Sequence, residues 1–461
     1  MQFLFSEEYK FRTWKKLWIA LAESEKELGL EITNGQIAEL KKYADVIDYE
    51  TAEAKEREIR HDVMSHVHAY AQQAPEGGKI IHLGATSCFV GDNTDLIILR
   101  EALKLTMGRL YRVIDNLRNF AEKHKSTATL GFTHYQPAQL TTIGKRACLW
   151  LQDFITDFTE LSRRLQDLKA RGAKGATGTQ ASYLNLFDND QKKVKALDRM
   201  VSEKIGFKEA YPVTGQTYPR KTDALVLSSL SSLAQSSHRF ATDMRLLSNL
   251  REMEEPSGKQ QVGSSAMAYK SNPMHSERIC SISRFIIAQS ENPAYTASTQ
   301  WLERTLDDSA NRRLCLAESF LAADAVLMLL ENVTGGLVVN RAMVDRHANL
   351  ELPFVATENL LMEGCKMGHN RQELHELIRE HSCSAAVQLK SGGDNPLLTL
   401  LAEDGRFPLD MAAIGAVIAA GNFTGRAPQQ VEEFLAEHVQ PILKAHSAFR
   451  ETAGKETHTI L

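Results

Sequence analysis

Glycine and proline are scarce in this sequence. The chain has 27 glycines and 12 prolines in 461 residues, about 8.5% of its length against a usual level near 12%. Because these residues supply most tight turns, the segments between turns must be long. This scarcity argues against sandwiches, barrels and propellers, which need many short strands and turns.

Long hydrophobic runs and an excess of charge of one sign are also missing. The longest uninterrupted apolar run extends from Met411 to Gly421, well short of the roughly 18 to 20 residues that a membrane helix needs. The 54 basic and 58 acidic residues give a net charge of −4, so no overall field favours nucleic acid or a membrane surface as a partner. We therefore expect a soluble chain in which local basic residues bind any anionic ligand.

The cysteines form no recognisable framework. Six of them are scattered along the chain without a C-x-x-C pair, which is typical of reduced thiols rather than disulfides or a zinc site. The N-terminal residues MQFLFSEEYKFR carry acids where a secretory signal would carry bases. We expect a cytoplasmic protein.

Apolar residues recur at spacings of three and four over unusually long stretches. The stretch from Leu140 to Leu168 predicts one helix of about 29 residues, roughly 43 Å long. Similar patterns run from Leu96 to Phe120, from Val226 to Leu247 and from Leu314 to Met328. Long helices with narrow apolar seams pack almost parallel in bundles. The alternative is a set of shorter helices with breaks that the pattern does not reveal.

The sequence therefore predicts an all-α fold with three helical domains. We place an N-terminal domain at residues 1–86, a central long-helix bundle at 87–339 and a C-terminal domain at 340–461. The loop Pro75 to Lys79, the pair Gly335-Gly336 and the turn Ser391 to Asp394 support these divisions. No repeat of 20 to 50 residues is evident, which argues against a solenoid.

Nucleotide-binding and metal-binding motifs are not convincing. The only glycine cluster, Gly172, Gly175 and Gly178, follows a basic helix end rather than a strand, so we expect a loop and not a dinucleotide fold. His61, His66 and His68 lack H-E-x-x-H spacing, and no cysteine or acid completes a ligand set. We expect neither a metal nor another cofactor.

Four polar segments interrupt the helical patterns: Arg60-His61-Asp62, LGATSCFVGDNTD at 83–95, GFTHYQPAQ at 131–139 and GSSAMAYKSNPMHSE at 263–277. In the last segment, small and hydroxyl residues precede Lys270 and a helix expected to begin near Met274. Backbone N–H groups, hydroxyls and a cation before a helix N-terminus can bind an anion. The alternative is a solvated linker.

The motif GSSAMAYKSNP closely resembles the G-S-S-x-M-P-x-K-x-N-P signature of the fumarase/aspartase superfamily. Members of that superfamily are long-helix bundles that eliminate fumarate from a substituted succinate. GFTHYQPAQ and GATSCFVGDNTD resemble two further regions of the superfamily, in the expected order. RHDVMSHVH at 60–68, TGQTYPRK at 214–221 and ERTLDDSANRR at 303–313 are similar to the adenylosuccinate lyase branch. The resemblance extends from about Tyr9 to Pro441.

This resemblance implies a set of catalytic roles. Elimination of fumarate requires a base for a weakly acidic C–H, an acid for the leaving nitrogen and an anion stabiliser. By resemblance, Ser264 is the base, His134 is the acid, and Glu277 pairs with that histidine and fixes its tautomer. His61 resembles a second, supporting histidine. Lys270, together with N–H groups of the loop and the helix start, would stabilise the serine alkoxide and the substrate carboxylate.

The resemblance also implies a substrate with one phosphate and two carboxylates, which needs several cations and hydrogen-bond donors. The residues in matching motifs are Arg60, Asp62, Thr86, Ser87, Thr133, Gln216, Asn272, Arg278, Arg304, Ser309 and Arg313. Taken alone, an arginine near Asp307 and Asp308 is an ordinary helix-surface ion pair, and His134 is a hydrogen-bonded loop histidine. Their joint occurrence in the expected order favours a site.

Two positions depart from the family pattern. Ala268 stands where the signature has proline, which predicts a less restrained loop. No Arg-Tyr pair precedes Phe3, although the family carries one that helps to bind the nucleotide. We expect either a shortened chain or weaker phosphate binding.

The resemblance implies a lyase that splits adenylosuccinate into AMP and fumarate and also cleaves the succinylated aminoimidazole carboxamide ribotide. Two alternatives stay open: another fumarate-releasing lyase of the argininosuccinate lyase type, and a non-catalytic structural homologue. The resemblance further implies a homotetramer in which three subunits build each active site. Apolar seams too long for one chain to cover agree with self-association.

Overall fold

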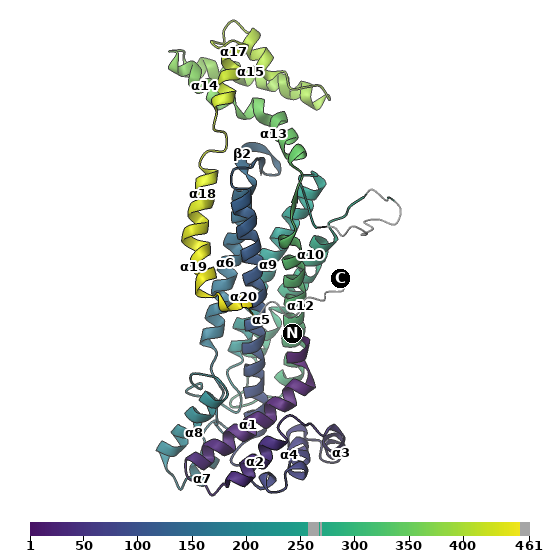
Figure 1. Cartoon of the computed structure of the whole chain (residues 1–461), viewed down its shortest axis with the longest axis vertical. Coiled ribbons are helices and arrows are strands. Elements are labelled where there is room, and N and C mark those ends of the chain that lie inside the picture. Colours follow the sequence, from purple (N-terminus) through teal and green to yellow (C-terminus); the bar gives the residue numbers. More distant parts are fainter. Residues whose placement is uncertain (257–266, 268–269, 452–461) are drawn as a thin grey trace.

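Four long helices form the centre of this computed structural model, which describes residues 1–256, 267 and 270–451. They are α5 (Ser87–Lys123), α6 (Ile143–Asp167), α9 (Lys221–Asn249) and α12 (Asp308–Gly335), and the shorter α10 (Met274–Gln289) and α11 (Asn292–Ser298) pack beside them. The helices lie roughly along the long axis of the molecule (Figure 1). The expected all-α bundle is confirmed.

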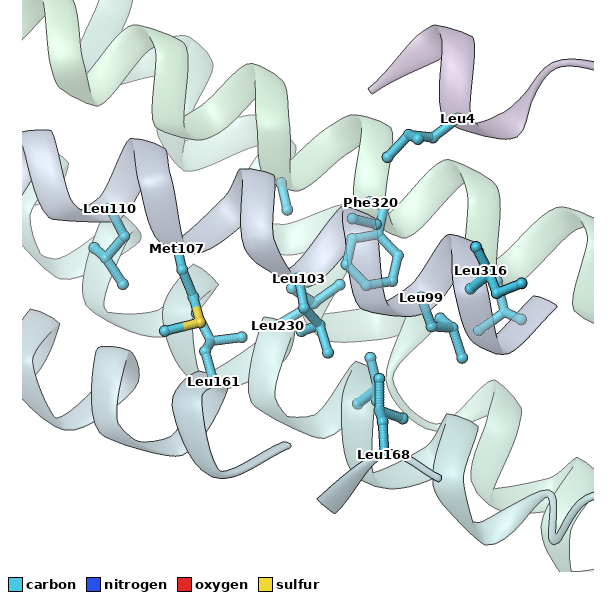
Figure 2. Close-up of a cluster of buried hydrophobic side chains, with 14 of the residues drawn as sticks. Leu4, Leu99, Leu103, Met107, Leu110, Leu161, Leu168, Leu230, Leu316 and Phe320 are labelled. Atoms are coloured by element: carbon cyan, nitrogen blue, oxygen red, sulfur yellow. The ribbon is translucent and has the colours of Figure 1, made fainter. Parts of the chain in front are cut away.

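The core of the bundle follows from the predicted periodicity. Leu99, Leu103, Met107 and Leu110 lie on one face of α5, and each is at most 1% exposed. They pack with leucines of α6 and α9 and with Phe320 of α12 (Figure 2). Residues three and four apart fall on one side of a helix, so a single seam of α5 contributes to the whole length of the core.

A β-hairpin precedes α6 and corrects one prediction. Strands β1 (Ala128–Thr133) and β2 (Gln136–Thr142) pair antiparallel, so Leu140 belongs to a strand and not to the predicted helix. Helix α6 begins only at Ile143, where the Thr142 hydroxyl accepts a hydrogen bond from Lys145 N–H at 3.1 Å. The apolar spacing continues across this boundary by coincidence, and the capping threonine was the signal that marks the true start.

The N-terminal elements lie at one end of the bundle with α7 (Ala181–Leu186) and α8 (Gln191–Lys204) (Figure 1). They comprise α1 (Glu7–Glu27), α2 (Asn34–Lys42), α3 (Tyr49–Ile59), α4 (Asp62–Gln73) and η2 (Gly77–Ile80). The short η1 (Gln2–Phe5) precedes them and packs along the bundle against α5. Trp14 and Trp18 of α1 are each 1% exposed. The glycines at 172, 175 and 178 have φ values of 76°, 80° and 80° in a loop, as predicted.

The C-terminal elements form a small lobe at the opposite end (Figure 1). Helices α13 (Arg341–Val355), α14 (Thr357–Lys366), α15 (Arg371–Lys390), α16 (Leu397–Glu403) and α17 (Met411–Ala420) enclose a separate core between Ala356 and Ile414. The chain then returns along the bundle through α18 (Ala427–Phe434), η3 (Leu435–Val439), α19 (Gln440–Ala445) and α20 (Ala448–Glu451). The domain boundaries at 86/87 and 339/340 stay predictions.

A second small sheet joins the ends of two long helices. Strand β3 (Met253–Glu254) follows α9 and pairs with β4 (Val338–Val339), which follows α12. Among the described helices, none is both long and apolar enough to cross a lipid bilayer.

Glu25 of α1 is an unusual buried carboxyl. It is 0% exposed, and neither side-chain oxygen has a hydrogen-bond partner. Burial raises the pKa of the Glu25 carboxyl to about 8, because desolvation disfavours the charged form.

We expect the Glu25 carboxyl to make the fold less stable as the pH rises. The folded-state pKa lies above the ordinary value of 4.5, so its stabilisation is full below about pH 4.5 and is lost as the pH rises through about 8. Glu25→Gln removes this titration. The melting temperature of the variant relative to the unmodified protein should rise between pH 5 and pH 8.5, whereas exposed Glu31→Gln should show no such trend. A constant difference across this range would contradict the assignment.

Candidate active site

A cavity of about 450 Å³ lies at the N-terminal end of the bundle, between α1, α4, α5 and α12. Its walls include five residues that the sequence predicted: Asp62, Ser87, Arg304, Ser309 and Arg313. Thr86 is the residue before α5. Gln216 is adjacent, because its side-chain oxygen lies 3.6 Å from the Cys88 sulfur, and Cys88 lines the cavity. Segments more than 200 residues apart therefore build one concave site.

Buried ion pairs underlie this cavity, and no motif in the sequence indicates them. The guanidinium of Arg220, which is 3% exposed, donates to Asp308 at 2.6 Å and to Asp92 at 3.1 and 3.3 Å. The Tyr218 backbone N–H also donates to Asp92, at 2.8 Å. These contacts join α5, the loop before α9 and the start of α12.

Arg312 forms the second half of the network. It donates to Asp223 at 2.7 Å and to Asp95 at 2.9 Å, and it also contacts the Tyr218 hydroxyl. Burial alone would lower the pKa of Arg312, but the carboxylate of Asp223 and the other acids beside it raise that pKa well above its ordinary value. Arg220 and Arg312 are therefore both positively charged, and both form ion pairs with aspartates of the network.

The remaining arginines of the cavity differ in their partners. Arg304 precedes α12 and donates to the buried Asp308 at 2.8 and 3.1 Å, so the alternative of an ion pair holds for this residue, although it also lines the cavity. Arg313 is exposed to the cavity. Within the described ranges it forms no ion pair, which leaves its guanidinium available to an anionic ligand.

The Arg60-His61-Asp62 segment sits at the rim of the cavity. Arg60 has a φ of 53° and ends α3, and its side chain lies on a shallow surface with Glu53, Glu56 and Arg57 rather than in the cavity. The Nδ1 atom of His61 accepts a hydrogen bond from Met64 N–H at 3.3 Å. A neutral His61 ring therefore carries its proton on Nε2, where it can donate to a ligand.

His134 occupies the tip of the β-hairpin. Together with Tyr135 it forms a two-residue loop, in which the φ values are 54° and 58°, and Thr133 pairs with Gln136 across the loop. Hairpin loops with two positive φ values normally take Asn and Gly, and a positive φ at other residues is costly and concentrates at functional sites. The exposed His134 is thus held at an outward-facing tip by a strained turn.

The start of α10 carries the third group of predicted residues. Lys270, Glu277 and Arg278 are exposed there, and Asn272 is half-buried. The helix begins at Met274 as predicted. Ser264, the expected base, and Ala268 lie outside the described residues.

Glu255 caps the start of α10. Its carboxylate, 8% exposed, accepts hydrogen bonds from Ser276 N–H at 2.6 Å and His275 N–H at 3.1 Å. The N–H groups of Met274 and Glu277 donate to the carbonyls of Asn272 and Pro273. The first-turn N–H groups of α10 therefore already have acceptors. The expectation that N–H groups of the loop and the helix start stabilise a serine alkoxide stays a prediction, because most of the loop lies outside the described residues.

The cavity and the hairpin lie far apart within one chain. Helix α5 has 37 residues and therefore spans about 55 Å. Ser87 begins this helix beside the cavity, whereas the hairpin with His134 follows its other end (Figure 1). No hydrogen bond or ion pair joins His134 to Glu277 in the described part of the chain. The described residues also contain no group of three His, Cys, Asp or Glu side chains placed to hold a metal ion.

We expect Glu255→Ala to destabilise the fold by about 1 to 3 kcal/mol, because it leaves two N–H groups of α10 without their buried acceptor. Glu255→Gln retains one side-chain oxygen and should lose less. Urea denaturation measures both free energies of unfolding, with exposed Glu318→Ala in α12 as the control. If Glu255→Ala costs no more than Glu318→Ala, the carboxylate does not stabilise the helix start.

Comparisons with solved structures show the fold, and a family model gives the class of protein. The fold matches a fumarate lyase from Mesorhizobium sp. BNC1 with a TM-score of 0.81 and 21% identity, over 95% of this chain and 97% of that one. A 3-carboxy-cis,cis-muconate lactonizing enzyme from Pseudomonas putida gives a TM-score of 0.81 at 20% identity, with the same coverage of both chains. Residues 4–287 match the family model described as Lyase. The bundle is thus that of the lyase superfamily.

Sequence comparisons narrow the assignment. Residues 353–434 match the model of the adenylosuccinate lyase C-terminus. The chain is 48% identical to the adenylosuccinate lyase of Saccharomyces cerevisiae, over 96% of this chain and 93% of that protein. It is 31% identical to the adenylosuccinate lyase of Aquifex aeolicus, over 83% and 85% of the two chains. The chain belongs to the adenylosuccinate lyase family, which confirms the resemblance and makes it a carbon–nitrogen lyase.

Proposed function

We propose that this chain cleaves adenylosuccinate into AMP and fumarate and also cleaves the succinylated aminoimidazole carboxamide ribotide, in purine nucleotide synthesis. The main support for this proposal is the 48% identity to the adenylosuccinate lyase of Saccharomyces cerevisiae over nearly the whole chain. It is supported by a cavity that combines Arg313 and Arg304 with the hydroxyls of Ser87 and Ser309. Such a donor set suits a phosphate-bearing substrate.

The proposed reaction is a β-elimination. Ser264 removes a proton from the carbon next to a substrate carboxylate, and the electron pair forms the double bond of fumarate. The C–N bond breaks, and His134 protonates the departing nitrogen. Lys270 stabilises the negative charge that spreads onto the carboxylate and the charge of the serine alkoxide. Glu277 orients His134, while His61 assists near the phosphate or the leaving group.

Substrate binding is assigned to the remaining predicted residues. Arg304, Ser309, Arg313, Ser87 and Asp62 line the cavity. The other proposed contacts come from its rim, the hairpin and the start of α10, and they are Arg60, Thr86, Thr133, Gln216, Asn272 and Arg278.

We also propose a homotetramer with shared active sites. Ser87 and His134 lie near opposite ends of α5, which spans about 55 Å, so they can act on one small molecule only if they come from different copies of the chain. Apolar side chains exposed on the long helices, such as Leu105, Leu149 and Leu314, are suited to a buried contact between copies. Six free thiols agree with a cytoplasmic location.

The catalytic assignment predicts that Ser264→Ala and His134→Ala each lose turnover by at least about a hundredfold, the lower end of general acid–base contributions. Fumarate release from adenylosuccinate, followed by absorbance and confirmed by chromatography of AMP, measures the effect. Circular dichroism should show unchanged helicity. A fully active Ser264→Ala variant would refute the base assignment, and absence of AMP and fumarate with the unmodified protein would refute the function. Argininosuccinate in the substrate panel tests the rival lyase.

Shared sites make a separate prediction. If different copies supply Ser264 and His134, mixing the two inactive alanine variants under conditions that exchange subunits should restore part of the activity, since some sites then contain neither substitution. Each variant treated alone is the control, and mass determination in solution gives the oligomeric state. Lack of restored activity despite demonstrated subunit exchange would contradict sharing.

A further inference from the structure

The cavity contains a lysine that the sequence analysis did not single out. Lys10 lies on α1, and the cavity wall also includes Ser6, Glu7 and Trp14 of the same segment. The spacing of these residues places them on one face at the start of the helix. We propose that Lys10 binds the phosphate of the nucleotide substrate together with Arg313, an inference that rests on the proposed function.

The surroundings of Lys10 leave its charge available. Its Nζ atom lies 4.8 Å from the centroid of the Trp14 ring and 5.1 Å from that of Phe11. These aromatic contacts hold a cation without neutralising it. In the residues that the structure describes, no carboxylate forms an ion pair with Lys10, whereas Arg304 is bound to Asp308.

The acidic residues of the cavity have other partners or are exposed, so none of them forms an ion pair with Lys10 or Arg313 in the described residues. Asp92 and Asp95 are bound to the buried arginines Arg220 and Arg312. Asp62 accepts a hydrogen bond from its neighbour Val63 N–H at 2.8 Å, and Glu7 is exposed in the first turn of α1. Among the cations that line this cavity, Lys10 and Arg313 are thus the two without a carboxylate partner in the described residues.

A phosphate fits this donor set better than the succinyl carboxylates do. The cavity offers Lys10 and Arg313 with two hydroxyls, from Ser87 and Ser309, and phosphate accepts several such bonds at once. Among the described residues proposed to act on the succinyl group, His134 lies on the hairpin at the other end of the bundle (Figure 1), and Lys270 precedes α10. The cavity is thus left for the nucleotide end of the substrate.

The test compares substrates with and without the phosphate. Lys10→Met should raise the KM for adenylosuccinate about tenfold or more, the effect of losing one charge-assisted hydrogen bond, with kcat within about twofold. For succinyladenosine, which lacks the phosphate, the two proteins should have equal kcat/KM. Lys10→Arg should retain most of the affinity, and exposed Lys16→Met on the same helix is the control. An equal loss for both substrates, or no loss for either, would overturn the inference.

A binding measurement separates this inference from the proposed function. Calorimetry with AMP and with adenosine needs no turnover, and Lys10→Met should weaken AMP binding about tenfold while leaving adenosine binding unchanged. If the unmodified protein releases no fumarate but shows this pattern, the proposed function fails and the phosphate contact stands. If it cleaves adenylosuccinate but Lys10→Met does not alter AMP affinity, the inference fails alone. Absence of AMP binding by the unmodified protein would also overturn it. Lys10→Gln replaces the methionine variant if that protein does not fold.

Discussion

The buried ion pairs of Arg220 and Arg312 are the interaction on which the candidate site depends. They join Asp92 and Asp95 of α5 to Asp223 of α9 and Asp308 of α12. Removing one partner would leave an uncompensated buried charge, which costs about 3 to 5 kcal/mol. The network therefore fixes the helix ends that shape the cavity. It also decides which cations remain for a ligand, because it engages both buried arginines and, through Asp308, Arg304.

The length of α5 imposes the second constraint. A rigid helix of 37 residues keeps the cavity and the hairpin about 55 Å apart, and no local loop movement closes such a distance. A site that needs groups from both ends has to be assembled between copies of the chain. The same long helices that give each copy its core thus make it catalytically incomplete by itself, if the proposed residue roles hold.

The sequence predicted the parts of the structure that local periodicity controls. The seam of α5, with Leu96, Leu99 and Leu103 buried, follows directly from spacings of three and four. The same rule failed at Leu140, because a strand residue happened to continue the spacing. Motifs located several of the cavity residues. They did not reveal the ion pair of Arg220 and Asp308, because these residues are 88 positions apart in the chain. No pattern along the chain distinguishes an arginine that binds a buried aspartate from one that binds a ligand.

Charge at the start of α10 restricts where a catalytic anion can be stabilised. A helix N-terminus normally attracts negative charge through its unpaired N–H groups, but here the Glu255 carboxylate already occupies those of His275 and Ser276. A second anion placed there would meet a carboxylate instead of free donors. If Ser264 acts as the base, Lys270 and not these two N–H groups is the proposed stabiliser of its alkoxide. The carboxylate that caps the helix start thus makes these two N–H groups unavailable to a catalytic anion, so the proposed stabilisation of the alkoxide depends more strongly on Lys270.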